Sequence, residues 1–297
     1  MVGLYFDRTN LKELPESIGK MSCLRFLVLN SSQIQTIPRT FKNLHNLEHL
    51  VFYNSPETSD IVNIDLPDIF QHLKNLKLFR VHGLFNVYIP PSFVKLENLE
   101  ELVLEYCFFS PKRSNYTRNL RNSDLDLDDL ETITSFICEL PDDLDRISSL
   151  KKMVLTYSNI RHLPESIINL RSLKEMNFTH SKQIKNIENI FDITSLEILN
   201  LSYCKLEIIP KTIGNLTNLK ALDLSWNKLK EIPFEIRNCR QLRKISLYRN
   251  SYSEQFESWI KYLVELPKLN YLTVGMGYFK LLPKELLDKK DLKIKEI

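Results

Sequence analysis

Glycine is scarce in this chain, with six residues among 297. A loop that cradles phosphate groups through its backbone needs several closely spaced glycines. Gly275 and Gly277 form the one GxG spacing in the sequence, and a single GxG inside an expected turn does not define a nucleotide site. The sequence therefore gives no reason to expect a bound cofactor.

Patterns for metal binding and for a disulfide framework are missing as well. The six histidines show neither an HExxH motif nor the spacing of paired ligands, so we expect no metal. The cysteines are odd in number, far apart and never arranged as CxxC: Cys23, Cys107, Cys138, Cys204 and Cys239. Such cysteines are typical of reduced thiols in a cytosolic protein.

An excess of one charge and a long apolar run are also absent. The 40 Lys and Arg residues nearly balance the 37 Asp and Glu residues, which gives a net charge of +3. This balance does not call for nucleic acid or an anionic membrane as partner. No run of about 18 apolar residues is present, so we expect no membrane insertion. The first ten residues, MVGLYFDRTN, do not resemble a secretion signal, and the expected location is cytoplasmic.

What the chain does contain is a repeat, LxxLxLxxNxLxxLP, with a period of 23 residues. The clearest copies begin at Leu196 and Leu219 and end at Pro210 and Pro233. The same frame predicts turns that begin at Met1, Leu24, Leu47, Leu76, Leu99, Leu127, Leu150, Leu173, Leu196, Leu219, Leu242, Leu269 and Leu292. A motif that keeps its register over so many copies does not arise by chance.

The spacing predicts the architecture. In the LxLxx segment, leucines alternate with other residues as in a strand, so the leucines enter a core and the residues between them face outward. The proline then begins a turn or short helix whose apolar residues return across the other side. A single turn cannot bury its own leucines, whereas stacked turns share a continuous core and form a parallel sheet on the concave face. The predicted fold is α/β, a right-handed solenoid with short helices on the convex face.

Units such as LPESIGKMSCLRFLVLNSSQIQTIP resemble the leucine-rich-repeat family in its 23-residue, LP-type form. The chain is similar to the repeats of plant intracellular Ras-group leucine-rich-repeat proteins and of plant disease-resistance receptors. The resemblance covers essentially the whole chain. It implies the solenoid fold and a role in protein recognition or scaffolding. The chain differs from extracellular members in lacking cysteine-rich end caps, and from resistance receptors in lacking a nucleotide-binding module.

We expect one leucine-rich-repeat domain over residues 1–297, with about 12–13 turns. Residues 110–126 are predicted to form a loop insertion, and residues 284–297 a C-terminal cap. The stretch 254–265 is predicted to be a longer helix that contributes to the core. The first turn is in register from Met1 with nothing to cap it, so association through this N-terminal end is possible.

The eighth position of the repeat carries an unusual number of large aromatic residues. Aromatic and arginine side chains dominate the energetics of protein interfaces. The candidate binding residues are Tyr106, Tyr157, His180, Tyr203, Trp226, Tyr248, Arg249 and Tyr271. The alternative is that these rings only stack on one another and cover the surface. A second, more apolar group near the N-terminus is either another contact surface or simply exposed surface: Tyr5, Phe26, Val28, Val51 and Tyr53.

No catalytic constellation emerges from the sequence. His82 and Glu105 are expected to be neighbours, and an ion pair in solvent is favoured over an acid–base pair because no nucleophile accompanies them. The predicted function is a non-catalytic, cytoplasmic module for protein–protein interaction, scaffolding or signalling. Three alternatives stay open: a ligand-sensing fragment of a larger receptor, a secreted or surface binding protein, and the substrate-recognition part of a ubiquitin ligase.

Overall fold

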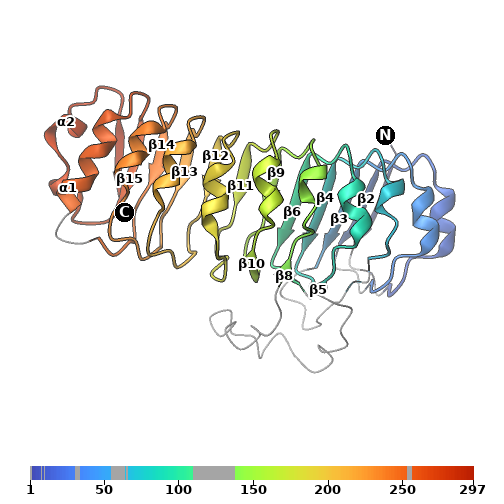
Figure 1. The fold of residues 1–297 in the computed structure, drawn as a ribbon. Helices are drawn as coiled ribbons and strands as arrows, with labels where there is room; N and C mark the ends of the chain where they lie inside the picture. Colours follow the sequence, from blue (N-terminus) through green and yellow to red (C-terminus); the bar gives the residue numbers. More distant parts are fainter. Residues whose placement is uncertain are drawn as a thin grey trace. The chain divides into compact units, whose positions relative to one another are not determined.

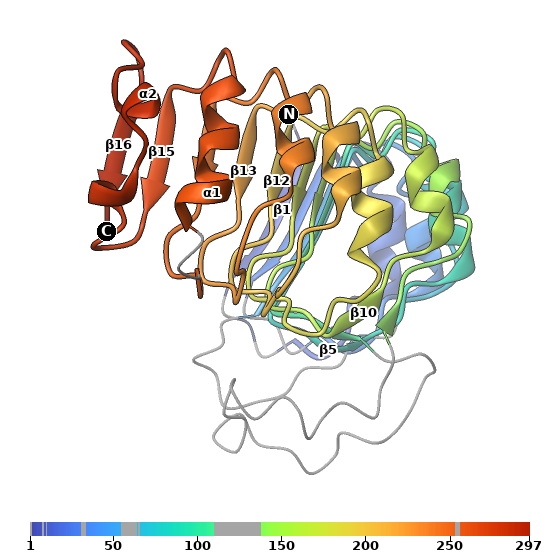
Figure 2. The same cartoon turned by 60° about the vertical axis from the view of Figure 1, so that its left-hand side comes forward.

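The computed structural model describes residues 2–7, 9, 11–30, 34–54, 64, 66–109, 138–252 and 256–297. The chain divides into two compact units, residues 1–166 and 167–297. Within each unit the strands lie side by side in one layer and the short helices form a second layer (Figures 1 and 2). The predicted loop insertion at 110–126 lies outside the described residues.

The first unit is built on a parallel sheet with the strand order β1-β2-β3-β4-β6-β9. Two further parallel pairs, β5 with β7 and β8 with β10, form small sheets beside it. The strands are β1 (Gly3–Asp7), β2 (Phe26–Asn30), β3 (His49–Tyr53), β4 (Leu78–His82), β5 (Phe85–Val87), β6 (Glu101–Glu105), β7 (Phe108–Phe109), β8 (Cys138–Glu139), β9 (Lys152–Val154) and β10 (Ile160–His162).

The second unit has the same construction, with a parallel sheet in the order of the sequence. Its strands are β11 (Glu175–Asn177), β12 (Ile198–Asn200), β13 (Ala221–Asp223), β14 (Lys244–Ser246), β15 (Tyr271–Val274) and β16 (Lys293–Glu296). Leu199 pairs with Leu222, and Asn200 with Asp223, so equivalent repeat positions align across neighbouring strands.

Most of the helices are single turns of 3-10 helix, and several begin directly after the proline of the repeat. They are η1 (Glu16–Lys20), η2 (Arg39–Asn43), η3 (Phe70–His72), η4 (Pro91–Lys95), η6 (Leu144–Arg146), η7 (Glu165–Asn169), η8 (Ile187–Asp192), η9 (Lys211–Asn215), η10 (Phe234–Asn238), η11 (Lys261–Glu265) and η12 (Phe279–Leu281), with two α-helices, α1 (Phe256–Ile260) and α2 (Lys284–Leu287). Pro210, for example, is extended at φ −70° and fixes the chain direction before η9. Ile213 then returns into the core.

The core follows the predicted register. Leu199 and Leu201 are completely buried, whereas Ile198 between the leucines of its turn is 43% exposed. Burial of one leucine side chain contributes about 1.5–3 kcal/mol. Because the buried residues recur in every described turn, the apolar interior is continuous within each unit, as the solenoid prediction requires.

The bend after each strand is stabilised by the ninth residue of the repeat. The side-chain oxygen of Asn227 accepts hydrogen bonds from the backbone N–H groups of Cys204 and Leu206, both at 3.0 Å. Its amide nitrogen donates to the carbonyl groups of Leu201 at 2.8 Å and Leu224 at 3.0 Å. One buried amide therefore joins two successive turns and satisfies backbone groups of both.

Cysteine replaces asparagine at this position in two turns. The Cys204 thiol donates to the carbonyl of Phe178 at 3.1 Å, and the Cys107 thiol to that of Glu105 at 3.2 Å. Burial raises the pKa of both thiols to about 12. These cysteines fill the bend and are poor nucleophiles at neutral pH.

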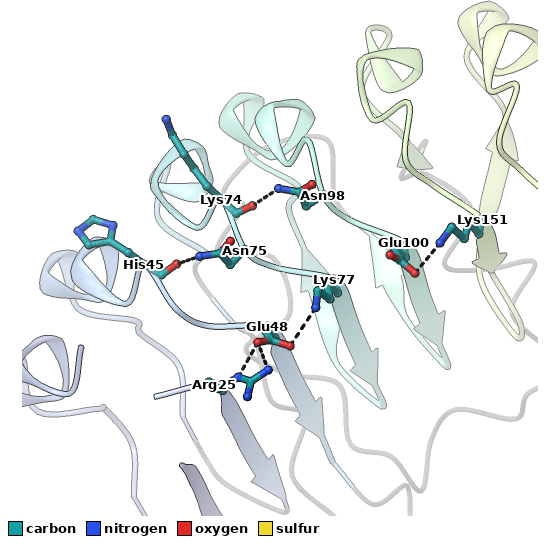
Figure 3. A network of polar contacts seen from close by, with 9 residues as sticks. All are labelled: Arg25, His45, Glu48, Lys74, Asn75, Lys77, Asn98, Glu100 and Lys151. Atoms are coloured by element: carbon teal, nitrogen blue, oxygen red, sulfur yellow. Dashed lines mark hydrogen bonds and ion pairs between the residues drawn. The ribbon is translucent and has the colours of Figure 1, made fainter. Parts of the chain in front are cut away.

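Polar side chains at the start of the strands also join neighbouring turns. Asn75 donates to the carbonyl of His45, and Asn98 to that of Lys74, each at 2.8 Å (Figure 3). Glu48 lies between Arg25 and Lys77 and pairs with both. These contacts repeat with the period of the turns and hold their spacing at the solvent-facing edge.

The segment predicted as a longer helix, 254–265, contains α1 followed by η11, and Trp259 and Leu263 are buried as expected. Residues 284–297 contain α2 and β16, and the Lys289 ammonium donates to the carbonyl of Leu266 at 2.6 Å. The capping role of this segment, the single domain over 1–297 and the association through the N-terminal end stay predictions.

Replacing Asn227 by alanine leaves several buried backbone groups without partners, each of which costs about 1–3 kcal/mol. We expect Asn227→Ala to lower the free energy of unfolding in urea by about 2–4 kcal/mol. Asn270, which is exposed, provides the matched control, and Asn270→Ala should leave stability unchanged. Equal effects of the two substitutions would contradict this account of the bend.

Thiol labelling separates the exposed cysteine from the buried ones. Cys23 is exposed, and Cys107, Cys204 and Cys239 are buried. A maleimide should label Cys23 in the native protein within minutes, and the three buried thiols only after denaturation. The measurement is mass spectrometry of labelled peptides. Rapid native labelling of Cys204 would show that the bend is open.

Candidate functional site

A row of stacked aromatic rings runs along the outward face of the sheet. We call this row of rings the aromatic ladder. In the second unit, the rings of His180 and Tyr203 stack with centroids 3.9 Å apart, and those of Tyr203 and Trp226 with centroids 4.5 Å apart. Both pairs are within 15° of parallel. The three residues are neither buried nor fully exposed, so each ring keeps part of its surface in solvent.

The first unit carries its own part of the aromatic ladder. The rings of Tyr53 and His82 stack at 4.4 Å, and those of Tyr106 and Tyr157 at 4.2 Å. His82 and Tyr106 connect the two pairs through a tilted contact at 5.1 Å. Tyr53 and His82 occupy the seventh position of their turns, so the sequence analysis, which followed the eighth position, did not place them in this row.

The backbone is left-handed at the eighth position of most described turns, which the repeat pattern does not predict. The pattern places these residues in the strand alternation, but the strands of the second unit end before them. Positive φ angles between 50° and 62° are found at Tyr106, Tyr157, His180, Tyr203, Trp226 and Arg249. The equivalent Gly83 has a φ of 69°. This conformation is unfavourable for side chains other than glycine.

Hydrogen bonds to the next turn hold this backbone in place. The N–H of His180 donates to the carbonyl of Ser202 at 3.0 Å, and the N–H of Tyr203 to that of Ser225 at 3.1 Å. Parallel pairing thus continues beyond the strands, and it fixes each ring above the one in the next turn.

The aromatic ladder ends in a cluster around Trp226. The indole N–H of Trp226 donates to the hydroxyl of Tyr248 at 2.8 Å. The guanidinium of Arg249 lies 4.8 Å from the centre of the indole ring, within the range of a cation–π contact. Arg249 itself is exposed. The structure thus brings these three candidate residues together, and their role in binding stays a prediction.

Tyr271 lies apart from the ladder, among residues of the strands. It lines a hollow of 310 Å³ in the sheet of the second unit, together with Ala221, Lys244 and Ser246. The small side chains of Ala221 and Ser246 leave this space between larger neighbours. Tyr271 therefore belongs to the same face of the second unit but not to the row of stacked rings.

Polar side chains beside the ladder are occupied by local hydrogen bonds. The side-chain oxygen of Asn200 accepts from the backbone N–H of Ser202 at 2.9 Å and from its hydroxyl at 2.7 Å. Asp223 and Ser225 repeat this arrangement one turn later. The Asn-x-Ser triplet at Asn200 thus has a structural reason, because its side chain supports the chain as it leaves the strand.

His82 and Glu105 are neighbours, as the sequence predicted, with 3.7 Å between Nδ1 and the carboxylate. The neighbouring His82 side chain is the main cause that lowers the pKa of Glu105. The ring of His82 also packs between Tyr53 and Tyr106, which fits a structural role in the ladder. In the described part of the chain, no group of three His, Cys, Asp or Glu residues could hold a metal ion. Nor is any described helix long and apolar enough to cross a bilayer.

Comparison with known proteins gives a consistent result. The family described as a leucine-rich repeat region matches residues 3–137 and 91–284. A leucine-rich-repeat protein of Leptospira interrogans superimposes with a TM-score of 0.70 at 25% identity, over 90% of this chain and 59% of that one. The chain thus spans about three fifths of that protein's solved chain. The internalin InlF of Listeria monocytogenes has a TM-score of 0.63 at 16% identity, covering 99% and 86% of the two chains. No curated protein matches the sequence.

The contact between Tyr106 and Tyr157 can be tested through ionisation. Burial and a hydrogen bond with Tyr157 raise the pKa of Tyr106 from 10.0 to about 12. The unfolded chain loses this proton first, so the corresponding stability is complete below pH 10 and is lost as the pH rises through about 12. Tyr157→Phe removes the hydroxyl but keeps the ring, and it should lower the pKa of Tyr106.

The measurement is the pH dependence of the ¹³C shift of labelled tyrosine rings. Tyr262→Phe, in the second unit, is the control and should not move the Tyr106 titration. An unchanged Tyr106 pKa in Tyr157→Phe would mean that the two hydroxyl groups do not interact.

Proposed function

Because the chain belongs to the leucine-rich-repeat family, whose members commonly mediate protein–protein interaction, we propose that it binds a partner protein through the aromatic ladder. The partner lies against the outward face of the sheet, on the concave side expected of such a solenoid. Trp226, Tyr203 and Arg249 form the centre of the contact in the second unit. The chain acts as a binding or scaffold module and not as an enzyme.

The observation that carries this proposal is the placement of large rings where the backbone favours glycine. A non-glycine residue in the left-handed region lowers the stability of the fold by roughly 1 kcal/mol. This loss recurs at successive turns that contribute a ring to the ladder. Glycine at these positions would relieve the strain but remove the rings. Rings that are already stacked and half-buried lose little entropy on binding, and they offer a large apolar surface to a partner.

The chemistry of the described residues supports a binding role. The thiols of Cys107, Cys204 and Cys239 are buried, and His82 is packed between rings, so these groups are poorly placed for nucleophilic or acid–base catalysis. The unpaired cysteines also support a reducing, cytoplasmic location.

Affinity purification with a double variant tests the proposal. Tyr203→Ala with Trp226→Ala removes two neighbouring rings without touching the buried leucines. We expect the folded double variant, verified by circular dichroism, to lose its specific partners by about 10-fold or more, since each interface anchor contributes on the order of 2 kcal/mol.

The chain offers a matched control on the helix side of the same unit. Phe234 and Tyr262 also form an aromatic pair, with centroids 5.1 Å apart, and Phe234 is 41% exposed. Phe234→Ala with Tyr262→Ala should retain every specific partner. Full partner recovery by the ladder variant, or equal losses from both variants, would overturn the proposed site.

A further inference from the structure

A second row of outward residues crosses the first unit, one lane away from the ladder. Parallel pairing aligns Tyr5, Val28, Val51, Arg80, Val103 and Val154, which we call the first-unit stripe. Five of the six are apolar or aromatic. Val28 and Val51 retain part of their surface in solvent, whereas Val103 and Val154 are buried. Arg80 is the one charged residue in this row, and a valine lies opposite it on either side.

Arg80 carries a buried donor without a hydrogen-bond acceptor. Its Nε is buried and makes no hydrogen bond among the described residues. Other cations beside this sheet are paired: Arg25 and Lys77 share Glu48, and Lys151 pairs with Glu100 at 2.9 Å (Figure 3). Arg80 differs from these three cations in this respect.

The nearest candidate acid is already engaged. Glu105 pairs with His82 at 3.7 Å, and the positive charge of Arg80 acts on Glu105 at longer range. A partly buried guanidinium with an unsatisfied N–H is an unfavourable arrangement in a folded protein. The unsatisfied N–H of Arg80 therefore lowers the stability of the isolated chain. A hydrogen-bond acceptor on another molecule would satisfy it.

We propose that Arg80 and the flanking apolar residues of the first-unit stripe bind a carboxylate side chain that a partner protein presents within an apolar segment. The planar guanidinium matches a carboxylate in bidentate geometry, and apolar walls strengthen that pair by excluding water. Val51, which keeps part of its surface in solvent, supplies such a wall. The inference rests on the protein-binding role proposed above, but it uses none of the ladder residues.

A carboxylate fits this stripe better than a phosphate. A nucleic-acid backbone brings several phosphates a few ångströms apart and needs several cations to receive them. The stripe offers one cation between valines, and the chain as a whole carries a net charge of only +3. One acidic residue with apolar neighbours is the complementary pattern.

The first test needs no partner. Arg80→Leu removes the unsatisfied donor and places an apolar side chain between valines, so the melting temperature should stay the same or rise. Arg39→Leu, at an exposed position on η2, is the matched control and should have no effect. A fall of several degrees in Arg80→Leu alone would mean that Arg80 supports the fold, and it would overturn the proposal.

The second test identifies the ligand chemistry. A random peptide display library is selected on the full chain, after removal of peptides that also bind the folded Arg80→Leu variant. We expect the selected peptides to carry one Asp or Glu between apolar residues. A synthetic copy should bind Arg80→Leu at least 10-fold more weakly than the native chain, and Arg39→Leu equally well.

Charge exchange completes the test. Arg80→Glu should abolish binding of the acidic peptide and restore binding of the same peptide with lysine in place of its acid. Failure to select any peptide that depends on Arg80, selection of peptides without an acid, or preference for a single-stranded RNA probe would each contradict the proposal. These outcomes are independent of the Tyr203 and Trp226 variants, so failure of the ladder and failure of the stripe can be told apart.

Discussion

The structure depends on one constraint: a turn of 23 residues is too small to bury its own leucines. Each turn must share its apolar interior with the next, and the parallel hydrogen bonds of the sheet fix the spacing at which this sharing works. The pairs Leu199–Leu222 and Asn200–Asp223 illustrate the result, since buried residues meet buried residues and outward residues meet outward residues. A shift by one residue would exchange the two sets.

The register between turns also determines how side chains are arranged on the outward face of the sheet. Because outward positions repeat at the strand spacing, similar side chains at one position become a continuous row. The ladder uses this geometry for ring stacking, and the first-unit stripe uses it to surround Arg80 with valines. The left-handed backbone of the ladder and the unsatisfied N–H of Arg80 both lower the stability of the protein. Neither feature is needed to form the solenoid. Positions where a protein departs from its most stable choice are where function is expected.

The sequence predicted the repeat, the buried leucines and the outward rings, because these follow from spacing alone. It also placed Trp226, Tyr248 and Arg249 in one group, and the structure brings these three side chains together. It could not predict the left-handed backbone at Tyr203 and its equivalents, since bulky residues normally avoid that region. It named Tyr53 only in the separate N-terminal group and did not name Arg80. The reason is that the contacts of these two residues across neighbouring turns depend on side-chain conformation.

The central claim, that register between turns decides the fold, can be tested by excision. Removing residues 196–218 deletes one 23-residue period and joins Ser195 to Leu219, so the frame is preserved. Removing residues 196–207 deletes about half of a period and joins Ser195 to Ile208, so one turn loses its strand while its convex part remains. Thermal unfolding followed by circular dichroism compares the two. The account predicts cooperative unfolding close to that of the full chain for the 23-residue excision, and a lower and less cooperative transition for the half-period excision. Equal behaviour of the two chains would contradict it.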